Sequence, residues 1–384
     1  MNFKFLNTEE KRYYTCNGKK FLNKFQAIHE QENSNQAINF IANPLYRDLD
    51  CSQEPQQSFE DILKEQALLI RKNFKIVRLW YSGGIDSDLV LDIFLKNKIH
   101  LDEIHVQHYG PRSFFPESYI ASDRLESIKH SIPSTKIIEH GKIFPYTIHK
   151  KTLMKDSWSF NGIDYPLRSF NVMRNPLGEE QFNTNLIELY GIAKPDILFI
   201  RGEWYMYMAD TSLHGCLTSG AKSYKHYFYA DYPEANIKQA HLLKKFLIKY
   251  IKEEKWNSTL IGFGEREQQQ IINEGSGRLL YNKDFIMKEL NNKEYIFQDK
   301  KYYFSNNKDR WGFEFARSNK EIWKLYEIYV QQCNTLSKRY NNYLNLGRIE
   351  LGTIGTFDRF YSLENNQSFT VDELFPAGFN TKYL

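Results

Sequence analysis

The sequence predicts an α/β fold: a doubly wound parallel sheet with a helical N-terminal segment and a C-terminal elaboration. From residue 75 onward, short apolar runs alternate with longer amphipathic segments, which is typical of strands that alternate with helices. A glycine-rich turn, Ser82 to Ser87, joins the first apolar run to the first amphipathic segment. The chain has 384 residues, of which 41% are hydrophobic and 26% charged, so it can form one large domain with additions or two to three smaller ones. Strand–helix alternation implies parallel strands with helices on both faces of the sheet.

Residues 1–70 are expected to form a helical N-terminal segment. Two stretches look helical, Phe25 to Ala42 and Ser58 to Lys72, and a polar, turn-rich stretch over 43–57 separates them. The second stretch carries an apolar stripe at helical spacing, with Ser58 as its N-cap and acidic residues in its first turn.

Residues 71–260 are expected to form the core domain. Its predicted strands are Ile76–Tyr81, Glu103–His108, Thr135–His140 and Asp196–Ile200. Its predicted helices are Asp86–Lys96, Pro116–His130, Gln181–Tyr190 and Pro233–Glu254. A polar insertion over about 150–175 interrupts this order. In such sheets ligands bind at the carboxyl ends of the strands, in the loops that lead into the following helices.

Residues 261–384 are assigned to a C-terminal elaboration that contacts a substrate or a partner. The region is rich in aromatic residues and is expected to be mostly helical. Its stretch from Gly347 to Leu363 has the glycine and β-branched content of short strands.

Composition and charge argue against several classes of protein. No stretch approaches the ~18 consecutive apolar residues of a membrane span, and charges stand where a secretory signal needs its apolar core, so we expect a cytoplasmic protein without a membrane partner. A net charge of +4 is close to neutral and does not indicate a nucleic-acid partner. The four cysteines form no CxxC pair, so the usual signature of a zinc ribbon, an iron–sulfur cluster or a dithiol redox site is missing.

The turn after the first predicted strand carries the functional argument. It consists of Ser82, Gly83, Gly84, Ile85, Asp86 and Ser87. Without a Cβ, the two glycines let the backbone turn sharply and bring its N–H groups against phosphate oxygens, and the following helix directs its positive end at the same anion. The two serines can donate hydrogen bonds to phosphates, while Asp86 is expected to cap the helix or to coordinate Mg²⁺. The alternative is an ordinary tight strand–helix turn with a capping aspartate.

The S-G-G-x-D-S pattern resembles the PP-loop of the N-type ATP pyrophosphatases. That superfamily contains asparagine synthetase, GMP synthetase, argininosuccinate synthetase, NAD synthetase, tRNA-modifying thiolases and PAPS reductase. The resemblance covers about residues 75–205 and implies a Rossmann-like core of the HUP type, which binds ATP with Mg²⁺ and releases pyrophosphate. One position departs from the family pattern: Asp88 stands where a small hydroxyl residue is common, and it adds negative charge beside the expected phosphate site.

The same resemblance implies further site residues. Backbone groups of Val106 and Gln107 would lie against the adenine, and Arg201, Gly202 and Glu203 would flank the α-phosphate and the substrate. With Asp86, the catalytic residues would be Arg201, which neutralises charge at the α-phosphorus, and Glu203, which holds Mg²⁺ or an amine. The alternative for Arg201 and Glu203 is a surface ion pair.

Outside the resemblance, two pairs of basic residues are candidates for a site. Lys238 shares a helix face with His241 and is a candidate for phosphate binding, although a solvated helix face is the simpler interpretation. His105 and His108 point to opposite faces of their strand and are not expected to share a metal ion, so a packing or hydrogen-bonding role is favoured for both.

These features favour an AMP-forming ligase in which a substrate oxygen attacks ATP and an amine or ammonia then displaces AMP, most like the synthetase half of asparagine synthetase. Asn2 stands where the glutaminase half would need a cysteine, so ammonia is expected to come free or from a partner. The chain also resembles asparagine-synthase-like proteins encoded by tailed phages. Two alternatives stay open. One is a sulfur-transfer or PAPS-reductase-like enzyme, suggested by the sequence IRGE but lacking paired cysteines; the other is a nucleotide-binding regulatory protein without turnover.

Overall fold

The fold is described from a computed structural model of the chain. The described residues are 4–21, 27, 30, 33–34, 36, 39–108, 116–140, 185–191, 194–200, 203–208, 223–252 and 358–374. None of the helices within these ranges combines the length and the apolar character that a membrane crossing requires. The predicted insertion over 150–175 lies outside the described residues.

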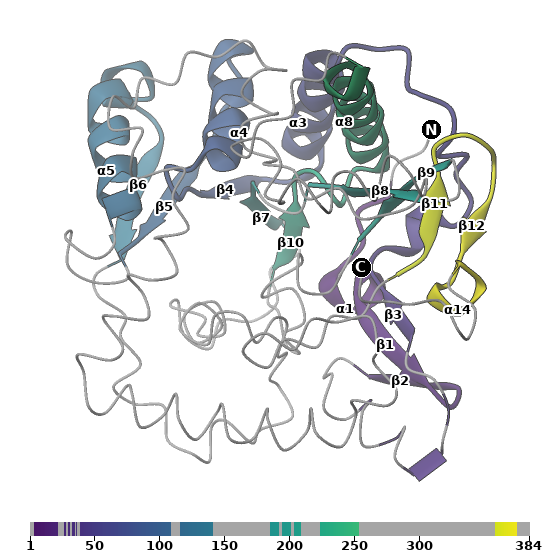
Figure 1. Cartoon of the computed structure of the whole chain (residues 1–384). Helices are drawn as coiled ribbons and strands as arrows, with labels where there is room; N and C mark the ends of the chain where they lie inside the picture. The colour runs from purple at the N-terminus through teal and green to yellow at the C-terminus, as the bar shows by residue number, and fades with distance from the viewer. Residues whose placement is uncertain are drawn as a thin grey trace.

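A five-stranded parallel sheet in the order β10-β7-β4-β5-β6 lies at the centre of the described structure (Figure 1). Its strands are β4 (Ile76–Trp80), β5 (Glu103–Gln107), β6 (Lys136–His140), β7 (Leu186–Tyr190) and β10 (Tyr224–Tyr227). The chain adds β5 and β6 on one side of β4, and later adds β7 and β10 on the other side. The boundary between β4 and β7 is therefore the point at which the strand order reverses. The predicted α/β class with a parallel sheet is confirmed.

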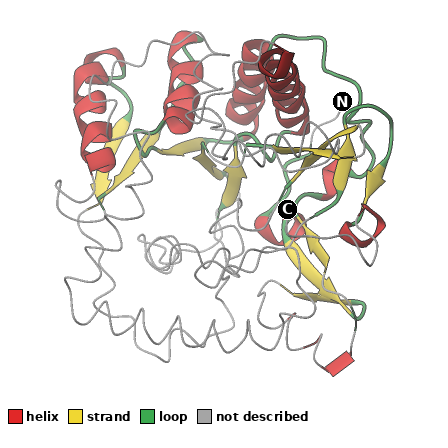
Figure 2. Ribbon diagram, in the orientation of Figure 1, coloured by secondary structure: helices red, strands yellow, loops and turns green. Residues whose placement is uncertain are grey.

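The four long helices lie together on one face of this sheet (Figures 1 and 2). They are α3 (Phe59–Asn73), α4 (Ile85–Lys96), α5 (Pro116–Ile128) and α8 (Pro233–Lys252). Each begins within one residue of its predicted start, and the Ser58 side chain caps α3 by accepting a hydrogen bond from the Asp61 amide. Within the described ranges no helix covers the other face, so the second helical layer of the predicted doubly wound sheet is not found there.

The reason is visible in the strands, which alternate instead of being apolar throughout. On the helix side their side chains are aliphatic and buried: Val77, Leu79, Ile104, Val106, Ile187 and Leu189. On the other side Ile76, Ile138 and Leu186 are aliphatic, but most side chains are charged or aromatic: Arg78, Trp80, Glu103, His105, Glu188 and Tyr190. A strand buried between two helical layers needs apolar residues on both sides, whereas period-two alternation suits one apolar face.

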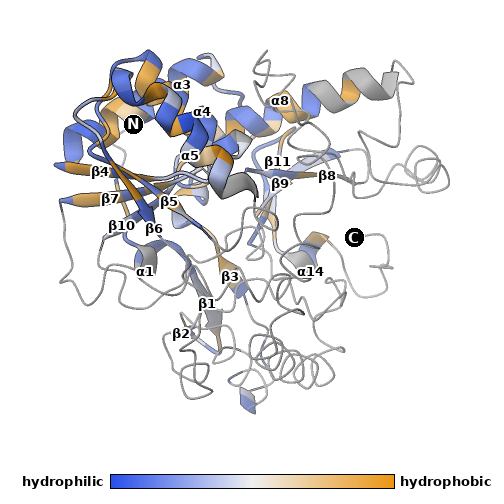
Figure 3. Ribbon diagram, turned by 90° about the vertical axis from the view of Figure 1, so that its left-hand side faces the viewer, coloured by the Kyte–Doolittle hydropathy of each residue, from blue (hydrophilic) through white to orange (hydrophobic). Residues whose placement is uncertain are grey.

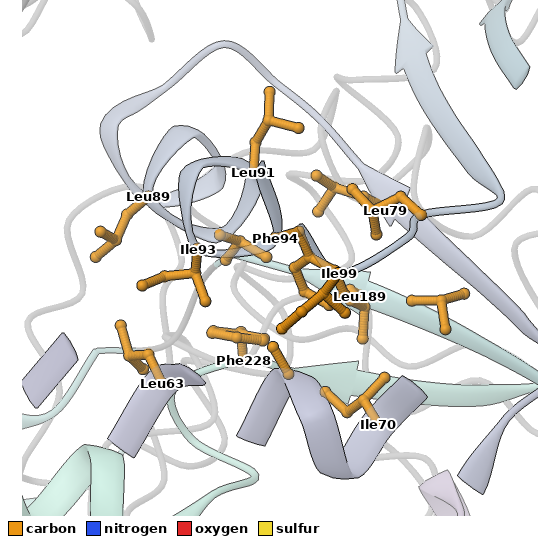
Figure 4. Packing of buried hydrophobic residues seen from close by; sticks show 14 of the residues in the cluster. Leu63, Ile70, Leu79, Leu89, Leu91, Ile93, Phe94, Ile99, Leu189 and Phe228 are labelled. Carbon is orange, nitrogen blue, oxygen red and sulfur yellow. The ribbon is translucent and has the colours of Figure 1, made fainter. Parts of the chain in front are cut away.

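The main hydrophobic core fills the space between the sheet and the helices (Figure 4). Leu63 and Ile70 of α3, Ile93 and Phe94 of α4, and Leu189 of β7 converge there. In the view turned by 90°, hydrophobic positions of α3 and α4 recur along the helices at intervals, as expected for helices with one buried side (Figure 3). This core anchors the start of α4, which carries the glycine-rich turn.

Two antiparallel sheets complete the described structure. A three-stranded sheet, β2-β1-β3, combines β1 (Tyr13–Cys16), β2 (Lys19–Phe21) and β3 (Asn39–Ile41). A four-stranded sheet, β12-β11-β9-β8, combines β8 (Asp196–Ile200), β9 (Glu203–Tyr207), β11 (Phe360–Ser362) and β12 (Ser368–Phe369). Short helical turns are α1 (Thr8–Lys11), η1 (Pro44–Tyr46), η2 (Lys129–Ser131) and α14 (Val371–Leu374). A second hydrophobic cluster joins both sheets to α8.

The prediction of a helical N-terminal segment is confirmed for α3 but misses three strands, β1, β2 and β3. The turn between β1 and β2 is Asn17–Gly18, and both residues have positive φ values, 51° and 70°. An Asn-Gly pair between β-forming residues is a strong hairpin signal, and it specifies this antiparallel ribbon. The strand β3 also falls inside the stretch Phe25 to Ala42, which was predicted to be helical.

Two predictions about the second half of the core are also wrong. The stretch Gln181 to Tyr190 was predicted to be a helix, but Leu186–Tyr190 is strand β7, next to β4 in the parallel sheet. Asp196–Ile200 is a strand as predicted, yet it pairs antiparallel with β9 in a different sheet. The C-terminal strand β11 pairs with β9, so residues 261–384 contribute directly to a sheet of the predicted core domain.

Candidate nucleotide-binding site

The glycine-rich turn leaves the carboxyl end of β4 and opens α4 at the boundary with β7. This is the switch point of the sheet, where the connections of neighbouring strands run in opposite directions and ligands of open α/β sheets bind. Gly83 has a φ of 75°, in the left-handed region that glycine adopts without strain. Gly84 is the N-cap of α4, with extended backbone and no capping side chain.

The two serines of the turn bond to each other and to the backbone of the turn. The Ser87 hydroxyl donates to the Gly84 carbonyl at 3.0 Å and lies 3.1 Å from the Ser82 hydroxyl oxygen. Ser82 Oγ accepts the Gly84 amide at 3.3 Å, and Ser87 Oγ accepts the Ser82 amide at 3.3 Å. Across the described part of the chain, the amides of Gly83, Ile85 and Ser87 have no hydrogen-bond acceptor. The turn therefore presents unused donors at the positive end of α4.

Asp86 lies in the first turn of α4 and does not cap the helix, contrary to one of the predicted roles. Its Oδ1 atom is 2.6 Å from the ammonium of Lys194, whose side chain is 4% exposed. The Asp86 carbonyl accepts a hydrogen bond from the Tyr229 hydroxyl at 3.1 Å. A buried lysine and a tyrosine from two other strand ends thus reach the first turn of α4.

Gly191, directly after β7, approaches the same turn closely. A Cβ atom at this position would lie 2.7 Å from the carbonyl carbon and oxygen of Asp86 and 2.7 Å from the Cα atom of Ser87. Only a residue without a side chain allows this approach. It brings the segment that carries Lys194 against the start of α4.

Asp88, the position that departs from the family pattern, is 7% exposed. It accepts a hydrogen bond from the Tyr81 hydroxyl at 2.8 Å, and its Oδ1 atom is 3.7 Å from Nε of Arg124. Burial, followed by the charge of Asp88, raises the pKa of Tyr81 far above its usual value, so the hydroxyl remains a donor. The extra charge is therefore compensated within the protein.

The remaining predicted site residues lie in different places. Val106 and Gln107 end β5, the parallel neighbour of β4, at the same edge of the sheet as the turn, and they pair with Glu139 and His140 of β6. Arg201 and Gly202 lie outside the described residues. Glu203 begins β9 in the antiparallel sheet, where it accepts hydrogen bonds from Tyr205 at 2.8 Å and Asn365 at 3.4 Å. The prediction that it flanks the α-phosphate depended on β8 ending at the same sheet edge as β4, and β8 does not.

Among the described residues, no hydrogen bond or ion pair joins Lys238 to the turn. Its ammonium lies 2.8 Å from Glu54 Oε1 and donates to the Pro55 carbonyl at 2.9 Å. Its helix neighbour His241 bonds the Cys51 carbonyl at 2.9 Å. This face of α8 therefore holds the segment 51–55, and the proposed phosphate role for Lys238 is a misassignment.

Metal coordination by Asp86 does not fit this arrangement. The Lys194 ammonium is within ion-pair distance of one carboxylate oxygen, and a cation there competes with a second cation. In the ranges that the structure covers, no group of three or more histidine, cysteine, aspartate or glutamate residues could hold a metal ion. Mg²⁺ therefore remains an expectation tied to ATP, without an assigned protein ligand.

Sequence reasoning missed Gly191, Lys194 and Tyr229. The signal for the first two was present in Ile187–Tyr190, where isoleucine and leucine alternate with glutamate and tyrosine before a glycine, as in a strand followed by a turn. Assigning this stretch to a helix concealed the loop that follows it. Tyr229 has no comparable local signal.

Comparison of the chain with models of known protein families, with curated proteins and with solved structures gives no match.

Proposed function

We propose that this protein is a PP-loop ATP pyrophosphatase that adenylates a substrate oxygen, releases pyrophosphate, and passes the activated substrate to an amine or ammonia. The observation that carries the proposal is the position of the Ser82–Ser87 turn. It stands at the switch point of a parallel sheet, opens a helix, and presents unbonded amides beside a buried lysine. Anion binding at such a helix start follows from its unsatisfied N–H groups and its dipole.

Lys194 supplies the positive charge that the family resemblance had assigned to Arg201. In the ligand-free arrangement its ammonium pairs with Asp86. The Asp86 side chain is 26% exposed and can be hydrated, whereas the Lys194 side chain is almost fully buried. A phosphate group that displaces the Asp86 carboxylate would therefore pair with an ammonium group that is already held in position. The amides of Gly83, Ile85 and Ser87 would supply hydrogen bonds to the same anion. Together these groups would stabilise the pyrophosphate as the bond to the α-phosphorus breaks.

The sulfur-transfer alternative gains no support from the described cysteines. Cys16 and Cys51 are both buried, and burial raises the pKa of Cys51 to about 12. A thiol with that pKa is not a thiolate at neutral pH and is a poor sulfur carrier. Cys216 and Cys333 lie outside the described residues.

The proposal is tested by measuring ATP binding calorimetrically, and pyrophosphate release with Mg²⁺, ammonia and a panel of carboxylates. The informative variant is Lys194→Met, which removes the ammonium and keeps most of the apolar stem. We expect ATP binding to weaken by about 2 kcal/mol, or roughly 30-fold in Kd, the value of a hydrogen bond to a charged group. Pyrophosphate release should fall at least as far.

The matched control is Lys238→Met, which also breaks a largely buried lysine–carboxylate pair but lies against Glu54. It should leave ATP affinity unchanged. Equal losses in both variants would indicate a general effect on stability and would contradict the proposed site. Tight ATP binding without pyrophosphate under every condition would favour the regulatory alternative.

A further inference from the structure

A chain of three side chains crosses the face of the parallel sheet that the described helices leave uncovered. Glu103 and His105 come from β5, and His140 is the last residue of β6. Nε2 of His105 lies 3.0 Å from Glu103 Oε2, and Nδ1 of His105 lies 2.9 Å from Nε2 of His140. We call these residues the histidine relay.

The proton positions in the histidine relay follow from its chemistry. Arg78 donates to the same Glu103 oxygen at 2.7 Å and lowers the pKa of that carboxyl, against the opposing effect of burial, so Glu103 is a carboxylate that only accepts. His105 must therefore carry its proton on Nε2, which makes its Nδ1 an acceptor. His140 must then donate from Nε2, and its lone pair lies on Nδ1.

The environment keeps the two imidazoles neutral and ordered. His105 is fully buried, and burial together with the charge of Arg78 lowers its pKa to about 4. The same two causes lower the pKa of His140, which is half-buried. The His140 ring stacks on Trp80 with centroids 5.4 Å apart, and Trp80 donates to Glu188, the second carboxylate paired with Arg78. Within the described ranges, Nδ1 of His140 has no hydrogen-bond partner.

The position of the histidine relay connects it to the candidate site. Trp80 is the last residue of β4, two positions before Ser82, so the His140 ring packs on the strand end from which the glycine-rich turn departs. In catalytic triads a carboxylate orients the histidine and fixes which ring nitrogen carries the proton, and here Glu103 and His105 would do the same for His140.

We propose that His140 is a general base whose Nδ1 accepts a proton from the amine that attacks the activated substrate, with His105 and Glu103 as positioning residues. The identity of the reacting group rests on the proposed function. The amine nitrogen forms a bond to the acyl carbon, AMP leaves with the electron pair of the broken C–O bond, and one N–H proton passes to Nδ1. The Nε2–H bond to His105 holds the ring in place, and because burial and Arg78 disfavour the imidazolium, His140 readily returns the proton to water.

The first test needs no turnover and uses the full chain. Nitrogen NMR of the imidazole rings reports which ring nitrogen carries the proton, and diethyl pyrocarbonate reports the nucleophilicity of each of the ten histidines by mass spectrometry. We expect the Nε2–H form at His140 and faster acylation of His140 than of His100, an exposed histidine near Asp102. Protonation of His140 on Nδ1, or acylation no faster than that of His100, would overturn the proposal.

Variants separate the base from its support. Glu103→Gln should slow acylation of His140 by about fivefold, because a charge-assisted hydrogen bond becomes a neutral one. His140→Gln keeps a donor for His105 and removes the base, and it should lower amine-dependent AMP formation roughly 10²-fold while pyrophosphate release in the first step is retained. His100→Gln is the matched control and should change neither.

The outcomes distinguish the two proposals. A wild-type chain that releases no pyrophosphate refutes the proposed function, while the ring-nitrogen and acylation results still decide on the histidine relay. Equal loss of both steps in His140→Gln would assign His140 a structural role and would refute its action as a base.

Discussion

The close approach of Gly191 to the first turn of α4 makes a quantitative prediction. Gly191 does not have a positive φ, so alanine fits its backbone conformation, and only space is lacking. The new Cβ would lie 2.7 Å from three backbone atoms of Asp86 and Ser87. Favourable contact between carbon atoms requires about 3.5–4.0 Å, so the two segments must separate by roughly 1 Å. Neither can yield by a rotamer change, because the contacts are with backbone.

We therefore expect Gly191→Ala to destabilise the fold by about 2 kcal/mol, within the usual range for overpacking. Melting temperature should fall by roughly 2–3 °C for a chain of this size. Urea unfolding followed by circular dichroism measures the first quantity, and calorimetry measures the second. Because the movement separates Lys194 from the turn, ATP affinity should fall as well.

Gly84→Ala is the matched variant, since it changes a glycine of the turn without this clash. Gly84 has φ −76° and ψ 162°, and the nearest atom to an added Cβ is Ser82 Oγ at 3.4 Å, an ordinary contact. Stability should stay within about 1 kcal/mol of wild type, while ATP binding weakens because the methyl group occupies space beside the amides. Unchanged stability in Gly191→Ala would refute the packing argument. Unchanged ATP affinity in Gly84→Ala would refute the proposal that the Ser82–Ser87 turn binds phosphate.

Three further predictions concern stability. Burial raises the pKa of Asp358 from 3.8 to about 6, so the folded state holds this proton more tightly than the unfolded state does. The contribution of Asp358 to the free energy of unfolding is complete below about pH 3.8 and falls by about 3 kcal/mol as the pH rises through 6, and Asp358→Asn should abolish that fall in urea titrations at pH 4 and 7. Asp231→Asn leaves the buried cations Lys11 and Arg12 without their carboxylate and should cost about 3–5 kcal/mol in the same assay, whereas a loss below 1 kcal/mol would contradict the burial of this cluster. Ser58→Ala removes the N-cap of α3 and should cost about 1 kcal/mol, measurable as a shift of the urea midpoint.

The sequence was informative wherever local signals and burial agreed. Ser58 marked the start of α3, and the apolar strand before Ser82 marked β4, because capping and periodicity act over a few residues. The Asn17–Gly18 turn was equally local but was overlooked, and with it the N-terminal ribbon. The helix predicted at Gln181 to Tyr190 failed because a short run of leucine and isoleucine satisfies either period, and length and flanking glycine had to decide.

The candidate site was predicted only in part, and for a different reason. The strand, the glycines and the helix of the turn follow one another directly in the sequence, so their arrangement could be predicted from it. Lys194 and Tyr229 reach Asp86 from the ends of β7 and β10, which are separated from it by more than a hundred residues. Because β8 was predicted to belong to the parallel sheet, Glu203 was predicted to lie at the site, whereas it begins β9 in the antiparallel sheet.

By itself, the sequence determined the α/β class and the strand–turn–helix unit at Ser82–Ser87, because these depend on residues that are close together in the chain. Only the tertiary structure decided which strands flank β4, and therefore which side chains meet the turn and which residues form the histidine relay. Strand order is set by the packing of distant segments, and the pairing of Lys194 with Asp86 and of His105 with His140 exists only once that order is known.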